Sequence, residues 1–153
     1  MRIALYQPEI AGNVGAVLRL AACFGVAVDI IEPTGFAFSD ARMRRAGMDY
    51  LDHVDIARHQ GWHEFRAAAG GRIILLTTRG TERLHDVAFA PDDTLLMGSE
   101  SAGVPPDVAH ACAARVRIPI MPSVRSLNLA VATGIAISEA LRQTGGLAGL
   151  QPG

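Results

Sequence analysis

Apolar runs alternate along the chain with stretches whose apolar residues recur at helical spacing. The runs are continuous rather than alternating with polar residues, which is typical of parallel strands buried on both faces. They span residues 2–6, 26–31, 72–77, 94–97 and 116–120, and a briefer strand is expected at 53–56. The pattern predicts an α/β fold with a mostly parallel sheet that is covered by helices on both faces.

The helical stretches lie between these runs. The first is predicted at 14–24, with Asn13 as its N-cap and Gly25 at its end. Residues 78–93 lack a clear period and are expected to be irregular. Further helices are expected at 40–46 after a Ser39 cap, at 62–69, after Pro105-Pro106, and at 127–141 after a Ser126 cap.

The 153 residues are expected to form one domain, with 145–153 as a flexible Gly-rich tail. Half of the residues are apolar and 19% are charged, which is typical of a globular protein. The longest apolar stretch, 127–141, is too short for a membrane span and contains polar residues. The N-terminus leads directly into a strand pattern, so no signal peptide is expected and the protein is predicted to be cytoplasmic.

The net charge and the spacing of possible metal ligands do not by themselves identify a binding partner. The net charge of −1 does not indicate a nucleic-acid partner. Two clusters, Arg42 to Arg45 and Arg115 to Arg125, fit either a local basic face or scattered solvated arginines. Cys23 and Cys112 are expected to be buried free thiols, and the pair His59 and His63 is interpreted as surface histidines, so no metal site is expected.

Residues 94–128 hold the candidate site, because two predicted strands each lead into a loop there. The first loop, 98–103, has glycines at both ends and the carboxylate of Glu100 between them. The second loop ends in Ser126-Leu127-Asn128. Ligands of open α/β sheets bind outside the carboxyl ends of the strands, where such loops gather. The chain has neither GxGxxG nor a P-loop, which disfavours NAD and P-loop nucleotides.

Several single residues near these loops have two interpretations. Arg19 interrupts an apolar helix, and a buried guanidinium requires a carboxylate or phosphate partner. That partner could be a substrate, or Glu100 in a structural salt bridge. Asn13 and Asn128 could be helix caps alone, and Glu100 could be a solvated loop carboxylate.

The ordered set of motifs is more specific than any single residue. Asn13-x5-Arg19, LMGSESAGVP (96–105), RIPIM (117–121) and RSLNLA (125–130) resemble the three motifs of the SpoU branch of the SPOUT RNA methyltransferases. The resemblance covers almost the whole chain. The segments YQPEI (6–10), IEPTGF (31–36), RRAGMDY (44–50) and LTTRG (76–80) are similar to the single-domain TrmL-type enzymes, which methylate the tRNA wobble ribose.

This resemblance implies a C-terminal trefoil knot and transfer of a methyl group from S-adenosylmethionine to the 2′-hydroxyl of the wobble cytidine or uridine, leaving S-adenosylhomocysteine and requiring no metal. Carried over by motif, the catalytic residues are Arg19, nearest the hydroxyl, with Asn13, Glu100 and Asn128. The cofactor-binding residues are Leu76, Gly98, Ile118 and Ser126, with Met121 and Leu127 as neighbours. Arg42, Arg44, Arg45 and Arg125 are candidates for RNA contacts.

The expected partners are tRNA and a second copy of the chain, with no membrane and no DNA. The family is homodimeric, and the segment 127–141 has small residues around much of its circumference and no clearly polar face. Such a helix fits a subunit interface, or else the centre of a monomer. Ala102, Ala130 and Ser138 depart from the residues that relatives often have, which leaves the RNA contacts and the tRNA target open.

Two other functions remain open at this point. The same chemistry could act on another tRNA site or on ribosomal RNA. The chain could also be a non-catalytic RNA-binding protein that has kept the fold, and such a protein would bind S-adenosylmethionine weakly or not at all.

Overall fold

The computed structural model describes residues 1–37 and 50–150. Within them, seven strands form one sheet in the order β3-β2-β1-β6-β4-β7-β5, and every neighbouring pair is parallel. The strands are β1 (Arg2–Tyr6), β2 (Ala27–Ile31), β3 (Ile56–His59), β4 (Ile73–Leu76), β5 (Glu82–Arg83), β6 (Thr94–Met97) and β7 (Ala114–Arg117). The helices are α1 (Ala11–Phe24), η1 (Leu51–His53), α3 (Trp62–Ala68), η2 (Leu84–Asp86), α4 (Pro106–Ala111) and α5 (Leu129–Thr144).

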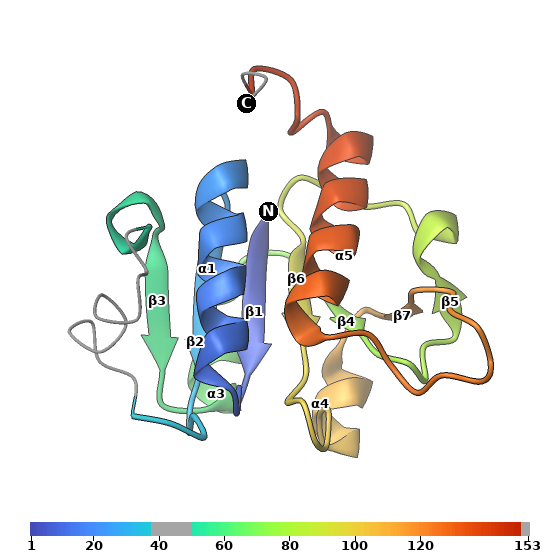
Figure 1. Cartoon of the computed structure of the whole chain (residues 1–153), viewed down its shortest axis with the longest axis horizontal. Coiled ribbons are helices and arrows are strands. Elements are labelled where there is room, and N and C mark those ends of the chain that lie inside the picture. The colour runs from blue at the N-terminus through green and yellow to red at the C-terminus, as the bar shows by residue number, and fades with distance from the viewer. Residues whose placement is uncertain (38–49, 151–153) are drawn as a thin grey trace.

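Helices cover both faces of the sheet, as predicted. Helices α1 and α5 lie side by side on one face, and α3 and α4 lie on the other (Figure 1). In β1, Ile3 and Leu5 join the core cluster under α1 and α5, whereas Ala4 belongs to the second cluster, with Phe65 of α3 and Val108 of α4. Both faces of the central strands are therefore buried, which explains their continuous apolar runs.

The sheet places the loops of the candidate site at one edge. Leu5 of β1 and Leu76 of β4 both pair with Met97 of β6, so these three strands end at the same level. From β1 the chain continues to β2 and β3 on one side, while β4, β7 and β5 lie on the other side of β6. The loops that follow β4 and β6 therefore lie close together at the carboxyl ends of the strands, where ligands of open α/β sheets bind.

Several predicted boundaries are wrong. Helix α1 begins at Ala11 with Ile10 as the N-cap, and the backbone N–H groups of Asn13 and Val14 donate to the Ile10 carbonyl. The cap of α5 is Asn128 rather than Ser126, because the Asn128 side chain accepts from the N–H groups of Ala130 and Val131.

The strands also differ from prediction at their ends. Strand β3 lies at Ile56–His59 because the residues before it form η1, and β7 ends at Arg117 instead of 120. The stretch 78–93 includes β5 and η2, so it is not wholly irregular. The predicted helix 40–46 and its Ser39 cap lie outside the described residues, as do 151–153 of the predicted tail.

Two predictions about thiols and histidines are corrected. Cys23 is exposed rather than buried, whereas Cys112 is half-buried and burial raises the pKa of its thiol to about 11. His59 is not on the surface, since it is buried with its Nε2 atom 2.9 Å from Oδ1 of Asp29.

In residues 1–37 and 50–150, no group of His, Cys, Asp and Glu could hold a metal ion. None of the helices in these residues has the length and apolar character to cross a membrane.

Candidate functional site

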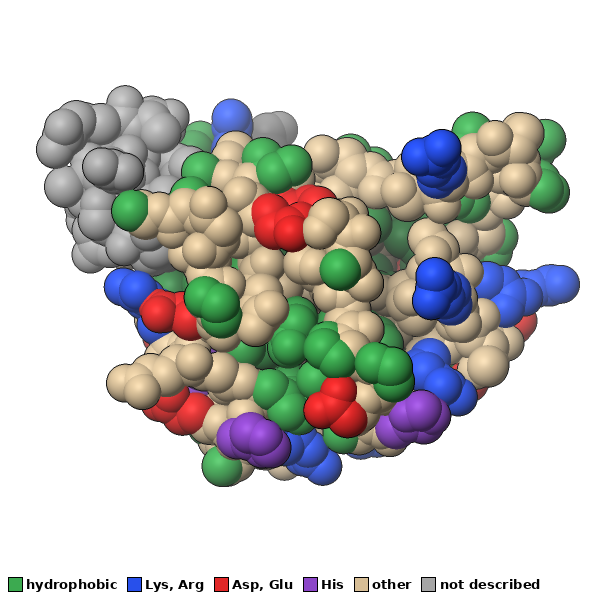
Figure 2. All heavy atoms as spheres, turned by 90° about the horizontal axis from the view of Figure 1, so that it is seen from below, with side chains coloured by type: hydrophobic (Ala, Val, Ile, Leu, Met, Phe, Trp, Pro, Cys, Tyr) green, Lys and Arg blue, Asp and Glu red, His purple; other side chains and the backbone are tan. Residues whose placement is uncertain are grey.

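A cavity of about 920 Å³ opens at the carboxyl edge of the sheet. The loops after β4, β6 and β7 surround it, together with the starts of α1 and α5, and Figure 2 views this edge. Its size is suitable for a small-molecule cofactor. Five of the six residues predicted to bind cofactor line it, namely Leu76, Gly98, Ile118, Ser126 and Leu127. Met121 does not, and its side chain is 71% exposed.

The loop after β6 is closed by a two-way hydrogen bond. The N–H of Ser99 donates to the carbonyl of Gly103 and the N–H of Gly103 donates to the carbonyl of Ser99, both at 2.9 Å. A Cβ atom on Gly98 would lie 2.6 Å from the carbonyl carbon of Gly103, and Gly103 itself has a φ of 72°. The cavity wall therefore requires glycine at both positions.

Glu100, at the tip of this loop, reaches across to the start of α1. Its carboxylate accepts from the backbone N–H groups of Glu9 (2.8 Å) and Ile10 (3.3 Å), and from Nδ2 of Asn13 (2.9 Å). Burial alone would raise the pKa of Glu100, but these hydrogen bonds outweigh it and lower the pKa below its usual value. The group is therefore an ionised acceptor, neither the solvated carboxylate nor the salt-bridge partner considered above.

Glu9, in the loop after β1, makes the reciprocal hydrogen bonds to the loop that carries Glu100. Its carboxylate accepts from the N–H of Ser101 (2.8 Å) and from the Ser101 hydroxyl (2.6 Å). Each of the two loops thus presents a carboxylate to the backbone of the other. Glu9 was not among the predicted site residues, because nothing in a single loop glutamate indicates a partner more than 90 positions away.

Asn13 links Glu100 to the C-terminal helix. While its Nδ2 donates to Glu100, its Oδ1 accepts from Nδ2 of Asn128 at 2.9 Å. The Oδ1 of Asn128 caps α5 at the same time. Three of the four predicted catalytic residues therefore form one hydrogen-bonded chain, Glu100–Asn13–Asn128, at the cavity.

Arg19 is the exception. Its side chain is exposed on α1 rather than buried, and its guanidinium carbon lies 5.1 Å from the ring centroid of Tyr50. It does not line the cavity of its own chain, and the salt bridge with Glu100 is absent from the described residues. The expectation of a buried or half-buried guanidinium is wrong.

Of the predicted RNA-contacting arginines, Arg125 lines the cavity, whereas Arg42, Arg44 and Arg45 lie outside the described residues. Two further arginines, Arg79 and Arg115, also line it. Neither was predicted to be a site residue, although Arg115 lies in one of the basic clusters.

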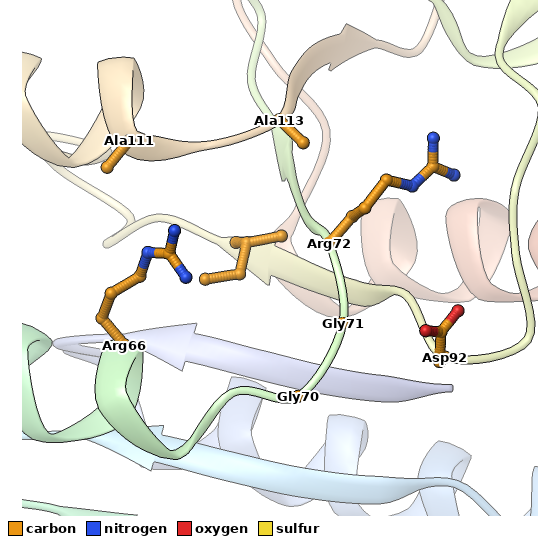
Figure 3. A pocket seen from close by; sticks show the side chains of 8 residues that line it. Arg66, Gly70, Gly71, Arg72, Asp92, Ala111 and Ala113 are labelled. Carbon is orange, nitrogen blue, oxygen red and sulfur yellow. The ribbon is translucent and has the colours of Figure 1, made fainter.

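A second hollow, of about 510 Å³, lies at the opposite edge, where strands β4, β6 and β7 begin. Arg66, Arg72 and Asp92 surround it (Figure 3). The Arg72 guanidinium is bound by both carboxylate oxygens of Asp93, at 2.9 and 2.7 Å. None of the predicted catalytic or cofactor-binding residues lines this hollow.

Known proteins resemble this chain along nearly its full length. The model of the SpoU rRNA Methylase family matches residues 1–138. A tRNA (cytidine(34)-2'-O)-methyltransferase of Beijerinckia indica subsp. indica is 54% identical over 149 residues, which are 95% of this chain and 93% of that protein. A protein of the same name from Escherichia coli (strain K12) is 40% identical, with 95% and 94% covered.

Solved structures agree with the sequence relatives. One, described as "Structural insights into the 2-OH methylation of C/U34 on tRNA", superposes with a TM-score of 0.87 at 42% identity, covering 93% of this chain and 94% of that one. The AdoMet-bound rRNA methyltransferase from Sinorhizobium meliloti gives a TM-score of 0.81 at 32% identity, covering 92% of this chain and 55% of that one. The resemblance predicted from the motifs is confirmed, and the chain belongs to the SpoU rRNA Methylase family.

Proposed function

We propose that this protein is a tRNA 2′-O-methyltransferase that acts on the ribose of the wobble cytidine or uridine. The observation that carries the proposal is the Glu100–Asn13–Asn128 chain beside a glycine-walled cavity, built from the residues that match the SpoU motifs. Relatives that are 40–54% identical over nearly their full length carry the name of this activity.

S-adenosylmethionine is the cofactor that we assign to the cavity. Leu76, Ile118 and Leu127 give it apolar walls, and the missing side chain of Gly98 leaves room for a ligand to approach the backbone. Apolar walls with nearby backbone polar groups suit an adenine ring. When bound, this cofactor supplies an already activated methyl group on a sulfonium, so the reaction requires no metal.

The protein then has two tasks, which are to hold the two reactants in line and to help the hydroxyl lose its proton. Glu100, Asn13 and Asn128 fix the loop after β6 against both helix starts, so the cavity keeps its shape. Arg19 remains protonated and is a poor general base. We assign to it the orientation of the hydroxyl or of an adjacent phosphate, and a substrate phosphate is the candidate proton acceptor.

A homodimer reconciles this role with the exposed position of Arg19. Helix α5 exposes Val131 (51%) and Ile135 (39%), and it packs beside α1, which carries Arg19. Exposed apolar side chains along a helix favour burial against a partner. In the proposed dimer this face is the interface, and Arg19 of one copy reaches the cavity of the other.

The remaining features of the proposal follow from the family. The C-terminal segment is expected to be threaded into a trefoil knot, Arg125 to contact RNA, and the protein to act in the cytoplasm, where tRNA is modified.

The decisive experiment is methyl transfer from labelled S-adenosylmethionine to purified total tRNA, with the modified nucleotide mapped by mass spectrometry. Label on the wobble ribose is the expected result. Label on another tRNA nucleotide, or only on ribosomal RNA, would support the alternative substrates. No cofactor binding in a calorimetric titration would instead support the non-catalytic RNA-binding protein.

The role of Arg19 is tested separately. Arg19→Ala is expected to lose most methyl transfer while it binds S-adenosylmethionine as the wild type does, because the residues that line the cofactor cavity are unchanged and Arg19 is assigned to the hydroxyl or phosphate of the RNA. Full activity of this variant would refute the assignment. Gly98→Ala is the complementary variant, since its new Cβ meets the Gly103 backbone and should abolish cofactor binding.

A further inference from the structure

Three arginines line the cavity. Arg79 follows β4, Arg115 belongs to β7, and Arg125 lies in the loop between β7 and α5. We call these three residues the arginine rim. The chain has no lysine, so every blue side chain in Figure 2 is an arginine, and several of them stand on one side of the hollow.

The rim arginines differ from four of the eight other arginines in the described residues in that no carboxylate partner is found for them. Arg2, Arg58, Arg72 and Arg142 each form an ion pair with an aspartate or glutamate. No ion pair within residues 1–37 and 50–150 involves Arg79, Arg115 or Arg125. Although the net charge of the whole chain is −1, the rim is locally cationic.

The loop that carries Arg79 is firmly attached to β7. The N–H of Thr77 donates to the Val116 carbonyl at 2.8 Å, and Arg117 donates to the carbonyls of Gly80 (2.6 Å) and Thr81 (3.3 Å). A Cβ on Gly80 would lie 2.4 Å from the Val116 carbonyl carbon, so the two segments are in direct backbone contact. Arg79 therefore projects from a fixed position, which lowers the entropic cost of using it to bind a ligand.

The opposite side of the cavity has the other sign of charge. There the carboxylates of Glu9 and Glu100 join the loops after β1 and β6. A polyanion that approaches the cavity is attracted by the rim and repelled from these carboxylates, so the charges define the side along which it lies.

We propose that the arginine rim binds the sugar-phosphate backbone of the RNA next to the nucleotide in the cavity, and so sets affinity and strand orientation rather than sequence preference. This inference rests on the proposed function and adds Arg79 and Arg115 to the expected contact of Arg125. Guanidinium groups match phosphate geometry with two parallel hydrogen bonds, and phosphate contacts carry no sequence information.

The test measures the salt dependence of binding to an anticodon stem-loop RNA with cytidine at the wobble position. Each phosphate contact that is lost should flatten the slope of log K against log salt by about 0.7 to 0.9. Arg79→Ala, Arg115→Ala and Arg125→Ala should each do so, and the triple variant should flatten the slope by roughly 2 to 3. Stem-loops of different sequence should be weakened to similar extents.

Two sets of variants control this measurement. Arg66→Ala removes an exposed arginine from the hollow at the opposite edge, and it should leave the slope unchanged (Figure 3). Arg79→Lys and Arg125→Lys keep the positive charge, so the salt dependence of RNA binding should stay close to that of the wild type. Methyl transfer by the alanine variants should show a larger change in the KM for RNA than in kcat, because phosphate contacts stabilise the bound RNA and the transition state alike.

An unchanged slope in the triple variant would overturn the proposal, as would an equal effect of Arg66→Ala. Either result leaves the proposed function standing if methyl transfer to tRNA persists. If the protein transfers no methyl group but the rim variants still flatten the slope, the proposed enzymatic function is refuted. The proposal that the rim binds RNA is then supported.

Discussion

Each edge of the sheet has a carboxylate that accepts hydrogen bonds from backbone and side-chain groups, but the two carboxylates have different roles. At the amino edge, the buried carboxylate of Asp93 accepts from Arg72 and from the N–H of Ala90, and these contacts join neighbouring chain segments. At the carboxyl edge, Glu100 also accepts from backbone and side chain, and its partners Ile10 and Asn13 line a cavity of about 920 Å³. Because Arg72 borders the hollow of about 510 Å³ at the amino edge, open space beside a hydrogen-bonded carboxylate does not by itself indicate a site. The network at the carboxyl edge differs because its members Glu100, Asn13 and Asn128 lie in the motifs of the family and line the cavity there.

The largest effect is expected from Glu100→Gln. A glutamine presents an NH2 group to the N–H donors of Glu9 and Ile10 or to Asn13, so the loop loses its fixed position. Methyl transfer in single-turnover assays should fall by about 100-fold, in the range seen when a preorganised polar contact is removed. Wild-type transfer by this variant would mean that the carboxyl-edge network is as purely structural as that of Asp93.

Asp93→Ala makes the reciprocal test at the amino edge. It leaves the N–H of Ala90 and the guanidinium of Arg72 without their acceptor. The free energy of unfolding, measured with denaturant, should drop by about 1 to 3 kcal/mol, a range kept low because Arg72 is half exposed. The rate of methyl transfer per folded molecule should equal that of the wild type. A loss of methyl transfer without a loss of stability would contradict the purely structural role of Asp93.

Asn128 allows the two kinds of role to be separated within one residue. Asn128→Asp keeps an oxygen to cap α5 but removes the amide that donates to Asn13, so stability should hold while transfer falls about 10-fold. Asn128→Ala loses both contacts and should in addition lower stability by about 1 kcal/mol. Equal stability losses in the two variants would show that the bond to Asn13, rather than the cap, supports the fold.

The smallest expected effect is a change of stability with pH that depends on Glu100. The pKa of Glu100 is lowered in the folded protein, so its contribution to stability is full above the ordinary carboxyl pKa of about 4.5. It is lost as pH falls through the lower, folded pKa. Denaturant midpoints of wild type and Glu100→Gln, measured from neutral pH downward, should therefore converge below pH 4.5. Parallel curves would contradict the lowered pKa.

The sequence predicted the architecture because burial dictates it. Continuous apolar runs mark strands covered on both faces, and six of the seven strands overlap or adjoin a predicted run. Strand β5 was missed because it has only two residues, both exposed. The start of β7 was placed at 116 instead of 114 because Arg115 alternates there with Ala114 and Val116, which breaks the apolar pattern.

Tertiary partners explain the remaining errors at the site. Asn13 is a good capping residue, yet Glu100 and Asn128 engage its side chain instead, and neither contact is visible in local sequence. Arg19 was expected to be buried because apolar residues surround it. The exposed side of α1 includes Gly12 and Ala16, so small residues rather than polar ones marked the outer face.

The bond between Asn13 and Asn128 joins residues 115 positions apart. A nascent chain that has emerged only as far as β6 already contains Asn13 and lacks its hydrogen-bond partner Asn128. Helix α5 must dock before this bond can form, so under the proposed function the timing of activity is tied to completion of the chain, and a product that ends before α5 would be unable to modify RNA.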